Sequence, residues 1–249
     1  MSERITHALV RDVQLEDLGT LALITLDNGA GPKKPNTIGP GGMASLREAL
    51  TEVSARAQAG EIVAAAVTGK MFHFAAGADL HGAAQINTRS EARAIAEQGH
   101  EVYSMLTDMA VPTFAYVGGA ALGGGLELAL SCTYRTVAEP VRNIGLPEVF
   151  LGLIPGWGGT YLLPHLIGIE AAAGVIIENP LRNNRQLDAA QAIEIGMMDA
   201  AFDGADFLAQ SLRWSAGVLR GEIAVNRPEP VSGDQWHQVL DAARTAVDS

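Results

Sequence analysis

The stretch Gly118–Cys132, GGAALGGGLELALSC, carries the most information about the fold. It follows an apolar run, Val111–Val117 (VPTFAYV), that predicts a buried strand, and it ends in a predicted short apolar helix, Leu126–Cys132. Three successive glycines, Gly123–Gly125, would leave bare backbone N–H groups where this helix begins, and the helix dipole favours negative charge there. The stretch therefore predicts a strand, a glycine turn and a helix, with a hole for an oxyanion at the turn.

Strand-like and helix-like stretches alternate on either side of this motif. Buried strands are also predicted at Leu21–Leu26, Ile62–Val67 and Tyr134–Ala138. Apolar spacing and capping signals predict helices that begin near Met43, Thr88, Asp188, Asp206 and Asp234. Residues 71–87 are predicted to be loop. The alternation predicts an α/β fold. The expected core contains Leu21, Ile24, Val63, Ala65, Val67, Phe114, Tyr116 and Leu128.

The composition is that of a globular chain with excess negative charge. Its 249 residues are 48% hydrophobic and carry a net charge of -11. Because nucleic-acid binding depends on neutralising phosphates, this charge argues against a DNA or RNA partner. Neither a signal-peptide core nor a run of about 18 apolar residues occurs, so we expect no membrane segment and a cytoplasmic location. The single cysteine, Cys132, suits that reducing compartment.

Two glutamates stand in apolar surroundings. Glu127 lies in the first turn of the predicted helix, within LELALS, where a carboxylate could simply stabilise the helix end. Its apolar neighbours instead predict burial, which can raise the pKa of a carboxyl group. Glu148 is bracketed by Leu146 and Val149, although a surface-loop glutamate would also fit. Two such groups beside a loop of N–H donors suit acid–base chemistry on one water molecule.

A further glycine-containing segment, Phe74–Leu80 (FAAGADL), follows the strand at Ile62–Val67. Its small residues would let the backbone approach a ligand closely, and Gly77 can adopt an unusual backbone dihedral. A tight turn before a helix is an equally good interpretation of this segment alone.

Other kinds of site lack their motifs. The run that begins at Gly123 lacks the third glycine of the dinucleotide-binding pattern G-x-G-x-x-G. There is neither a P-loop nor a G-x-S-x-G nucleophile elbow. The six histidines and one cysteine show no metal-ligand spacing. We therefore expect no metal and no separate cofactor.

The motifs AAGADL (75–80), ALGGGLELAL (121–130) and LPEVFLGLIPGWGGT (146–160) together resemble the crotonase, or enoyl-CoA hydratase/isomerase, superfamily. The resemblance extends from about Leu21 to Leu212 and is strongest to the hydratase half of multifunctional fatty-acid oxidation chains. It implies a ClpP/crotonase-like α/β fold, a spiral of strand–strand–helix units. It also implies hydration of 2-enoyl-CoA thioesters, with coenzyme A as part of the substrate.

The resemblance assigns roles to individual residues. The backbone N–H groups of Ala78 and Gly124 would bind the thioester oxygen, while Glu127 and Glu148 would hold one water molecule. Glu148 would supply the proton to the α-carbon and Glu127 would assist the water. Gly156 would help to hold that water.

Binding of the substrate and its coenzyme A is expected to involve Ala76, Gly77, Asp79, Leu80 and Lys33. Lys33 is a candidate for the phosphates, although Lys33 and Lys34 would equally fit a solvated loop. Asp79 is interpreted as a structural loop cap. His81 stands where the family often has a lysine, which weakens any ion pair at neutral pH.

The carboxyl-terminal region is shorter than usual for the family. We expect a core domain over residues 1–204 and a helical segment over 205–249, with 28 residues after Gly221. In the family, terminal helices cover the acyl pocket and make trimer contacts. A homo-trimer or hexamer is expected, with a β-oxidation subunit as a further candidate partner. The short end fits a fragment, a reduced relative or one half of a split multifunctional system.

Two other functions remain compatible with the sequence. A Δ3,Δ2-enoyl-CoA isomerase would use the same fold, but isomerases commonly dispense with the glutamate at position 127. A non-catalytic subunit that binds acyl-CoA or a partner chain is suggested by the short carboxyl end. For a catalytic chain, we expect Gly124→Val to abolish turnover with the fold retained, and a change at Gly123 to matter less.

Overall fold

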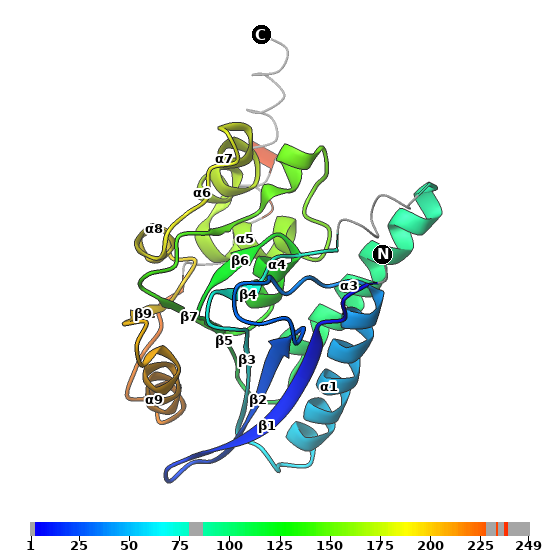
Figure 1. Cartoon of the computed structure of the whole chain (residues 1–249). Coiled ribbons are helices and arrows are strands. Elements are labelled where there is room, and N and C mark those ends of the chain that lie inside the picture. The colour runs from blue at the N-terminus through cyan, green and yellow to red at the C-terminus, as the bar shows by residue number, and fades with distance from the viewer. Residues whose placement is uncertain (1–2, 80–86, 228–232, 234–236, 239–249) are drawn as a thin grey trace.

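The computed structural model describes residues 3–79, 87–227, 233 and 237–238 (Figure 1). The strands are β1 (His7–Leu15), β2 (Gly19–Asp27), β3 (Ala64–Thr68), β4 (His73–Ala75), β5 (Thr113–Val117), β6 (Ala120–Leu122), β7 (Tyr134–Ala138), β8 (Ile144–Gly145) and β9 (Ala200–Phe202). The α-helices are α1 (Pro40–Gln58), α3 (Arg89–Thr107), α4 (Gly124–Leu130), α5 (Gly159–Ile167), α6 (Ile169–Ala173), α7 (Asn179–Leu181), α8 (Ala189–Glu194) and α9 (Phe207–Leu219). A 3₁₀ helix, η1 (Pro147–Leu151), and a π-helical turn, η2 (Gly174–Glu178), complete the set.

The strands form two sheets. The larger has the order β1-β2-β3-β5-β7-β9 and is parallel except for β1, which is antiparallel to β2. The smaller, β4-β6-β8, is parallel throughout. The successive units β3-β4-α3, β5-β6-α4 and β7-β8-η1 each place one strand in each sheet before a helical element (Figure 1). This repeat is the spiral of strand–strand–helix units that the resemblance implies, so the expected α/β fold is confirmed.

The four predicted strands correspond to β2, β3, β5 and β7, but no strand of the smaller sheet was predicted: β4 lies in the predicted loop 71–87 and β6 in the predicted glycine turn. Strands β4 and β6 have three residues each, which is too short for an alternating apolar pattern to show. They are held by pairing with each other and with β8. Strand β1 also escapes the apolar pattern, because this edge strand carries mainly exposed and half-buried residues.

The capping signals locate two helices correctly. Thr88 and Asp188 each form a capping box at the start of α3 and α8. Helix α4 begins at Gly124, two residues before the predicted start, so two of the three glycines are helical. The elements from α5 to α7 are additional to the prediction. The helix expected from Asp234 lies outside the described residues apart from 237–238.

The core packs between the large sheet and its covering helices. Seven of the eight expected core residues are buried. The prediction was wrong for Val63, which directly precedes β3 and is only half-buried. Helix α9 packs onto the same sheet, because Trp214 contacts the Phe114 ring edge-on and the Ser215 hydroxyl lies 2.8 Å from that of Tyr116. The proposed domain boundary at residue 204 stays a prediction.

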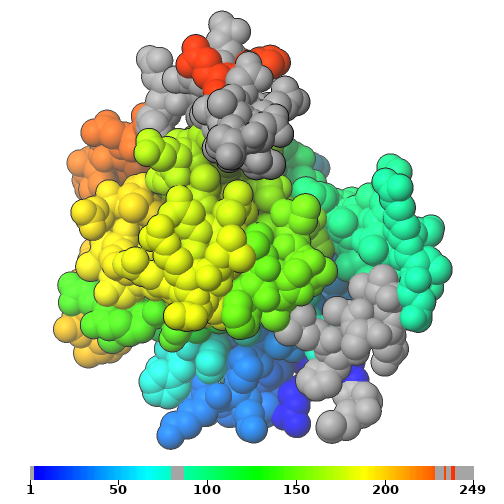
Figure 2. All heavy atoms as spheres, turned by 90° about the horizontal axis from the view of Figure 1, so that it is seen from above, coloured from blue at the N-terminus to red at the C-terminus, as the bar shows by residue number. Residues whose placement is uncertain are grey.

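Viewed from above, the segment from η1 to α8, green to yellow, covers the middle of the molecule, and α3 lies at one side (Figure 2). Within the described ranges, no helix combines the length and apolarity needed to cross a bilayer.

Candidate active site

The segment Ala76–Asp79 lies against Ile38 and approaches the start of α4. The N–H of Ile38 donates to the carbonyl of Gly77 at 2.8 Å, and the N–H of Asp79 donates to the carbonyl of Ile38 at 3.1 Å. Gly77 has φ +85°, and a β-carbon on it would lie 3.1 Å from the nitrogen of Gly124. Glycine is therefore required at position 77 for its dihedral and for the close approach of these two loops.

The amides of Ala78 and Gly124 are the two predicted oxyanion donors. Because Ile38 bonds to the residues on either side of Ala78, the N–H of Ala78 faces away from this bridge. Neither N–H donates to an acceptor among the described residues, whereas the neighbouring Gly123 N–H donates to the carbonyl of Gly145 at 2.9 Å. Two unpaired amides, one of them at a helix start, have the composition of an oxyanion hole.

Glu127 is buried, with 2% of its surface exposed, in the first turn of α4. Its Oε1 atom accepts hydrogen bonds from the backbone N–H groups of Trp157 and Gly159, both at 2.8 Å. Burial raises the pKa of this carboxyl group, and these two hydrogen bonds partly oppose the increase. One oxygen of Glu127 is thus fixed by the backbone at the start of α5.

Glu148 lies in η1, beside the glycine turn. A β-carbon on Gly123 would lie 2.6 Å from Oε1 of Glu148, so this carboxyl group reaches the turn itself. Its Oε2 atom is buried and has no hydrogen-bond partner within the described part of the chain. Burial first, and the negative charge of Glu127 second, raise the pKa of Glu148 to about 7. Glu148 is therefore not an ordinary surface-loop glutamate, and it can hold or release a proton near neutral pH.

The segment Ala76–Asp79 is also held by Asn36, which precedes α1. The N–H of Ala76 donates to the carbonyl of Asn36 at 2.7 Å. The Asn36 amide is fully buried and donates to the carbonyls of Leu26 and Phe74, so it ties β2 to β4. No role was predicted for Asn36, although a polar residue after Pro35, in a loop between buried segments, could have indicated one. Leu80 and His81 lie outside the described residues.

Lys33 is exposed and forms no ion pair with any described residue. The loop that carries it is held by Lys70, whose Nζ donates to Oδ1 of Asn28 at 2.5 Å and to the carbonyl of Gly31 at 3.0 Å. The structure thus leaves the ammonium group of Lys33 available to an anion without bringing it to the two glutamates.

The role expected for Gly156, helping to hold the water molecule, stays a prediction. A β-carbon there would meet only the carbonyl of Ile154, at 3.8 Å, so its neighbours impose no need for glycine. The amides that hold Glu127 belong to Trp157 and Gly159, for which no role was predicted. The usable signal was the GWGGT sequence itself, because it places backbone donors at a helix start.

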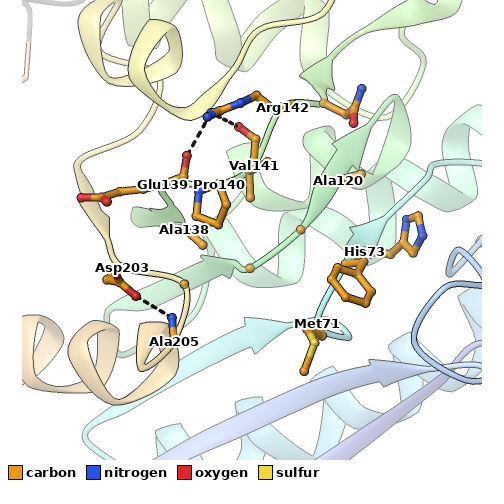
Figure 3. A pocket seen from close by; sticks show the side chains of 15 residues that line it. Met71, His73, Ala120, Ala138, Glu139, Pro140, Val141, Arg142, Asp203 and Ala205 are labelled. Atoms are coloured by element: carbon orange, nitrogen blue, oxygen red, sulfur yellow. Dashed lines mark hydrogen bonds between the residues drawn. The ribbon is translucent and has the colours of Figure 1, made fainter.

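A surface cavity of about 950 Å³ lies elsewhere, between Met71–His73, the turn at Gly118–Ala120 and residues 138–143 (Figure 3). None of the predicted site residues lines it. Within the described ranges, no three His, Cys, Asp or Glu side chains gather as a metal site requires.

Known proteins are similar to this chain over most of its length. A family model described as enoyl-CoA hydratase/isomerase matches residues 16–227. The fatty acid oxidation complex subunit alpha of Shewanella loihica is 40% identical over 153 residues, which is 61% of this chain and 21% of that protein. The corresponding subunit of Shewanella frigidimarina is 31% identical over 223 residues, 89% of this chain and 29% of that protein. The chain therefore spans less than a third of these curated relatives.

Solved structures share the fold. The structure of Pseudomonas aeruginosa DspI matches with a TM-score of 0.70 and 32% identity, over 88% of this chain and 83% of that one. The enoyl-CoA hydratase of Bacillus anthracis matches with a TM-score of 0.71 and 27% identity, over 85% and 76% of the two chains. Because the family model covers most of the sequence and the fold is shared over most of its length, this chain belongs to the enoyl-CoA hydratase/isomerase, or crotonase, family.

Proposed function

We propose that this chain adds water across the double bond of a 2-enoyl-CoA thioester, in the breakdown of fatty acids or related acyl groups. The observation that carries the proposal is the state of Glu148, whose Oε2 is buried without a described partner and whose pKa is raised to about 7. A carboxyl group with such a pKa can exchange a proton in either direction at neutral pH.

The reaction follows from the positions of the donors and carboxyl groups. The thioester oxygen accepts hydrogen bonds from the amides of Ala78 and Gly124, which are free for it. Glu127 orients a water molecule, and the water oxygen attacks the β-carbon. Charge that develops on the thioester oxygen is stabilised by the two amides. Glu148 gives its proton to the α-carbon and recovers one from the added water, so that H and OH are both accounted for.

The fixed geometry of Glu127 supports this division of labour. Its Oε1 already accepts two backbone hydrogen bonds, which leaves Oε2 to face a water molecule. A carboxylate held in this way keeps its orientation during the reaction, whereas the unpartnered oxygen of Glu148 can change its protonation without breaking a protein hydrogen bond. The two groups therefore suit a water-holding role and a proton-transfer role.

The direct test is hydration of crotonyl-CoA, followed as loss of the enoyl absorbance, with formation of the 3-hydroxyacyl product checked by mass. A parallel reaction with a 3-enoyl-CoA separates the isomerase alternative, in which the double bond moves and no water is added. Turnover of the 3-enoyl substrate alone would assign isomerisation. Binding of acyl-CoA with neither reaction would assign the non-catalytic alternative.

We further propose that the exposed Lys33 binds the coenzyme A phosphates.

We also propose that the chain assembles as a homo-trimer or hexamer. Large apolar side chains are exposed along η1 and the loop after it, among them Phe150, Leu153 and Ile154. Such a concentration of exposed apolar surface is typical of a protein interface. Light scattering gives the mass, and a monomer would contradict the assembly.

A further inference from the structure

The indole of Trp157 bridges α3 and α4 at two glycines. A β-carbon on Gly99, in the middle of α3, would lie 2.0 Å from Cδ1 of this ring. A β-carbon on Gly124, at the start of α4, would lie 2.3 Å from Cε3 and Cζ3 at the opposite end of the same ring. The absence of a side chain at each position therefore lets the indole touch both helices directly.

Tyr103 completes this arrangement from the next turn of α3. Its ring meets the indole edge-on, with the ring centroids 5.5 Å apart. Its hydroxyl donates to the carbonyl of Gly124 at 2.9 Å, and its side chain is buried. The indole nitrogen of Trp157 donates to the carbonyl of Ile95, one turn before Gly99 in α3. Gly124 is thus held by the indole of Trp157, which packs on its α-carbon, and by Tyr103 of α3, which donates a hydrogen bond to its carbonyl.

The backbone of Trp157 reaches the other part of the site. Its N–H donates to Oε1 of Glu127 at 2.8 Å. The same residue therefore contacts the glycine that carries an oxyanion amide and the carboxyl group that holds the water.

We propose that Trp157 and Tyr103 are positioning residues, an inference that rests on the proposed function. They fix the oxyanion amide of Gly124 and the carboxylate of Glu127 in their positions relative to each other. Neither side chain needs to touch the substrate. Gly99 is the residue in α3 whose missing side chain makes this arrangement possible. Glycine is a poor helix former, and here its backbone cost is offset by the space it leaves for the indole.

The experiment displaces the indole of Trp157 from its α3 side, opposite Gly124. In Gly99→Ala, the new methyl group pushes the ring toward Gly124 from a position outside the site. The matched control is Gly174→Ala, because Gly174 is helical, with φ -55°, and a β-carbon there meets nothing within 4 Å. Tyr103→Phe is the second variant, since it removes one hydroxyl and keeps the ring.

Two readouts are compared, namely kcat and KM for enoyl-CoA hydration and the absorption of a bound arylacryloyl-CoA. The second reports polarisation of the thioester carbonyl and does not depend on turnover. We expect Gly99→Ala to lower kcat roughly 100-fold, as misplacement of reacting groups by an ångström does. Tyr103→Phe should lower kcat roughly tenfold, with KM little changed. In both variants, the absorption of bound arylacryloyl-CoA should be shifted less than in the parent. Gly174→Ala should match the parent in every respect.

The outcomes separate the two proposals. If Gly99→Ala does not fold, Tyr103→Phe decides alone. A folded Tyr103→Phe protein with the parent's kcat and absorption shift would show that these side chains only fill the core. A parent that polarises the arylacryloyl thioester but hydrates nothing would refute the proposed reaction, while the absorption series would still test the positioning role.

Discussion

A β-carbon on Gly123 would lie 2.6 Å from Oε1 of Glu148, so the glycine turn and the second glutamate are in direct contact. Gly123 also has φ +52°, a region that side chains rarely adopt. The turn thus has two purposes. Gly124 carries the free amide, and Gly123 leaves the space into which the carboxyl group of Glu148 fits. The sequence alone predicts that a change at Gly123 matters less for chemistry than one at Gly124, whereas this contact leads us to expect an effect on Glu148 as well.

Gly123→Ala should therefore displace Glu148 and lower kcat roughly 100-fold, because a shift of about 1 Å in a reacting group has that effect. The matched control is Gly60→Ala, since Gly60 has φ +73° and a β-carbon there meets nothing within 4 Å. Gly60→Ala should lose about 1 kcal/mol of stability to its positive φ. Gly123→Ala should lose more, because its φ of +52° is combined with a ψ of -130°, outside the left-handed helical region. Steady-state kinetics and urea unfolding check the pair, and equal kcat values would show that Glu148 does not depend on this contact.

Replacement of Glu148 by glutamine should change the pH dependence of stability. The pKa of this carboxyl group is raised from 4.5 to about 7 in the folded protein, so the folded state retains a proton that the unfolded state has lost. The parent therefore loses stability as the pH rises from about 4.5 to about 7, by roughly 3 kcal/mol. Glu148→Gln should remove that loss. We expect it to be the more stable protein at pH 8 and to match the parent near pH 4, as measured by urea unfolding. Parallel curves for the two proteins would contradict the raised pKa.

The same pKa predicts the pH profile of hydration. If Glu148 donates the α-proton, only its protonated form is active in that direction. The value of kcat/KM for hydration should then fall about tenfold per pH unit above pH 7. Dehydration of the 3-hydroxyacyl product should depend on pH in the opposite sense. A hydration profile that stays flat from pH 6 to pH 9 would assign the α-proton to another group.

Gly124→Val should lose stability as well as turnover, so the fold that the sequence leads us to expect would be retained in a less stable form. Its β-carbon would lie 2.3 Å from the indole of Trp157. Overpacking of a buried contact of this kind costs roughly 2–3 kcal/mol. Urea unfolding measures the change. A variant with the parent's stability would mean that the indole moves away at no cost.

The motifs predicted more of this molecule than the periodicity did. The segments at Gly77, Gly124 and Glu127 are recognisable because glycine and a buried carboxylate are unusual in apolar stretches, and the structure brings them together. Strands β4 and β6 could not be predicted, since three-residue strands exist only through pairing with segments far away in the sequence. The packing of the Trp157 indole between Gly99 and Gly124 could not be predicted either, because these three residues are separated by tens of positions in the sequence.

The central claim is that Glu127 and Glu148 act together on one water molecule, and a set of three variants tests it most directly. Glu127→Gln, Glu148→Gln and the double variant keep the shape of both side chains and remove their proton chemistry. The measurement is kcat for crotonyl-CoA hydration, with binding of a saturated acyl-CoA as the check on the site. We predict that each single variant loses roughly 10³-fold or more, that the double variant loses little beyond the worse single variant, and that binding persists in all three. A single variant that hydrates at the parent's rate, or losses that simply multiply in the double variant, would contradict joint action on one water.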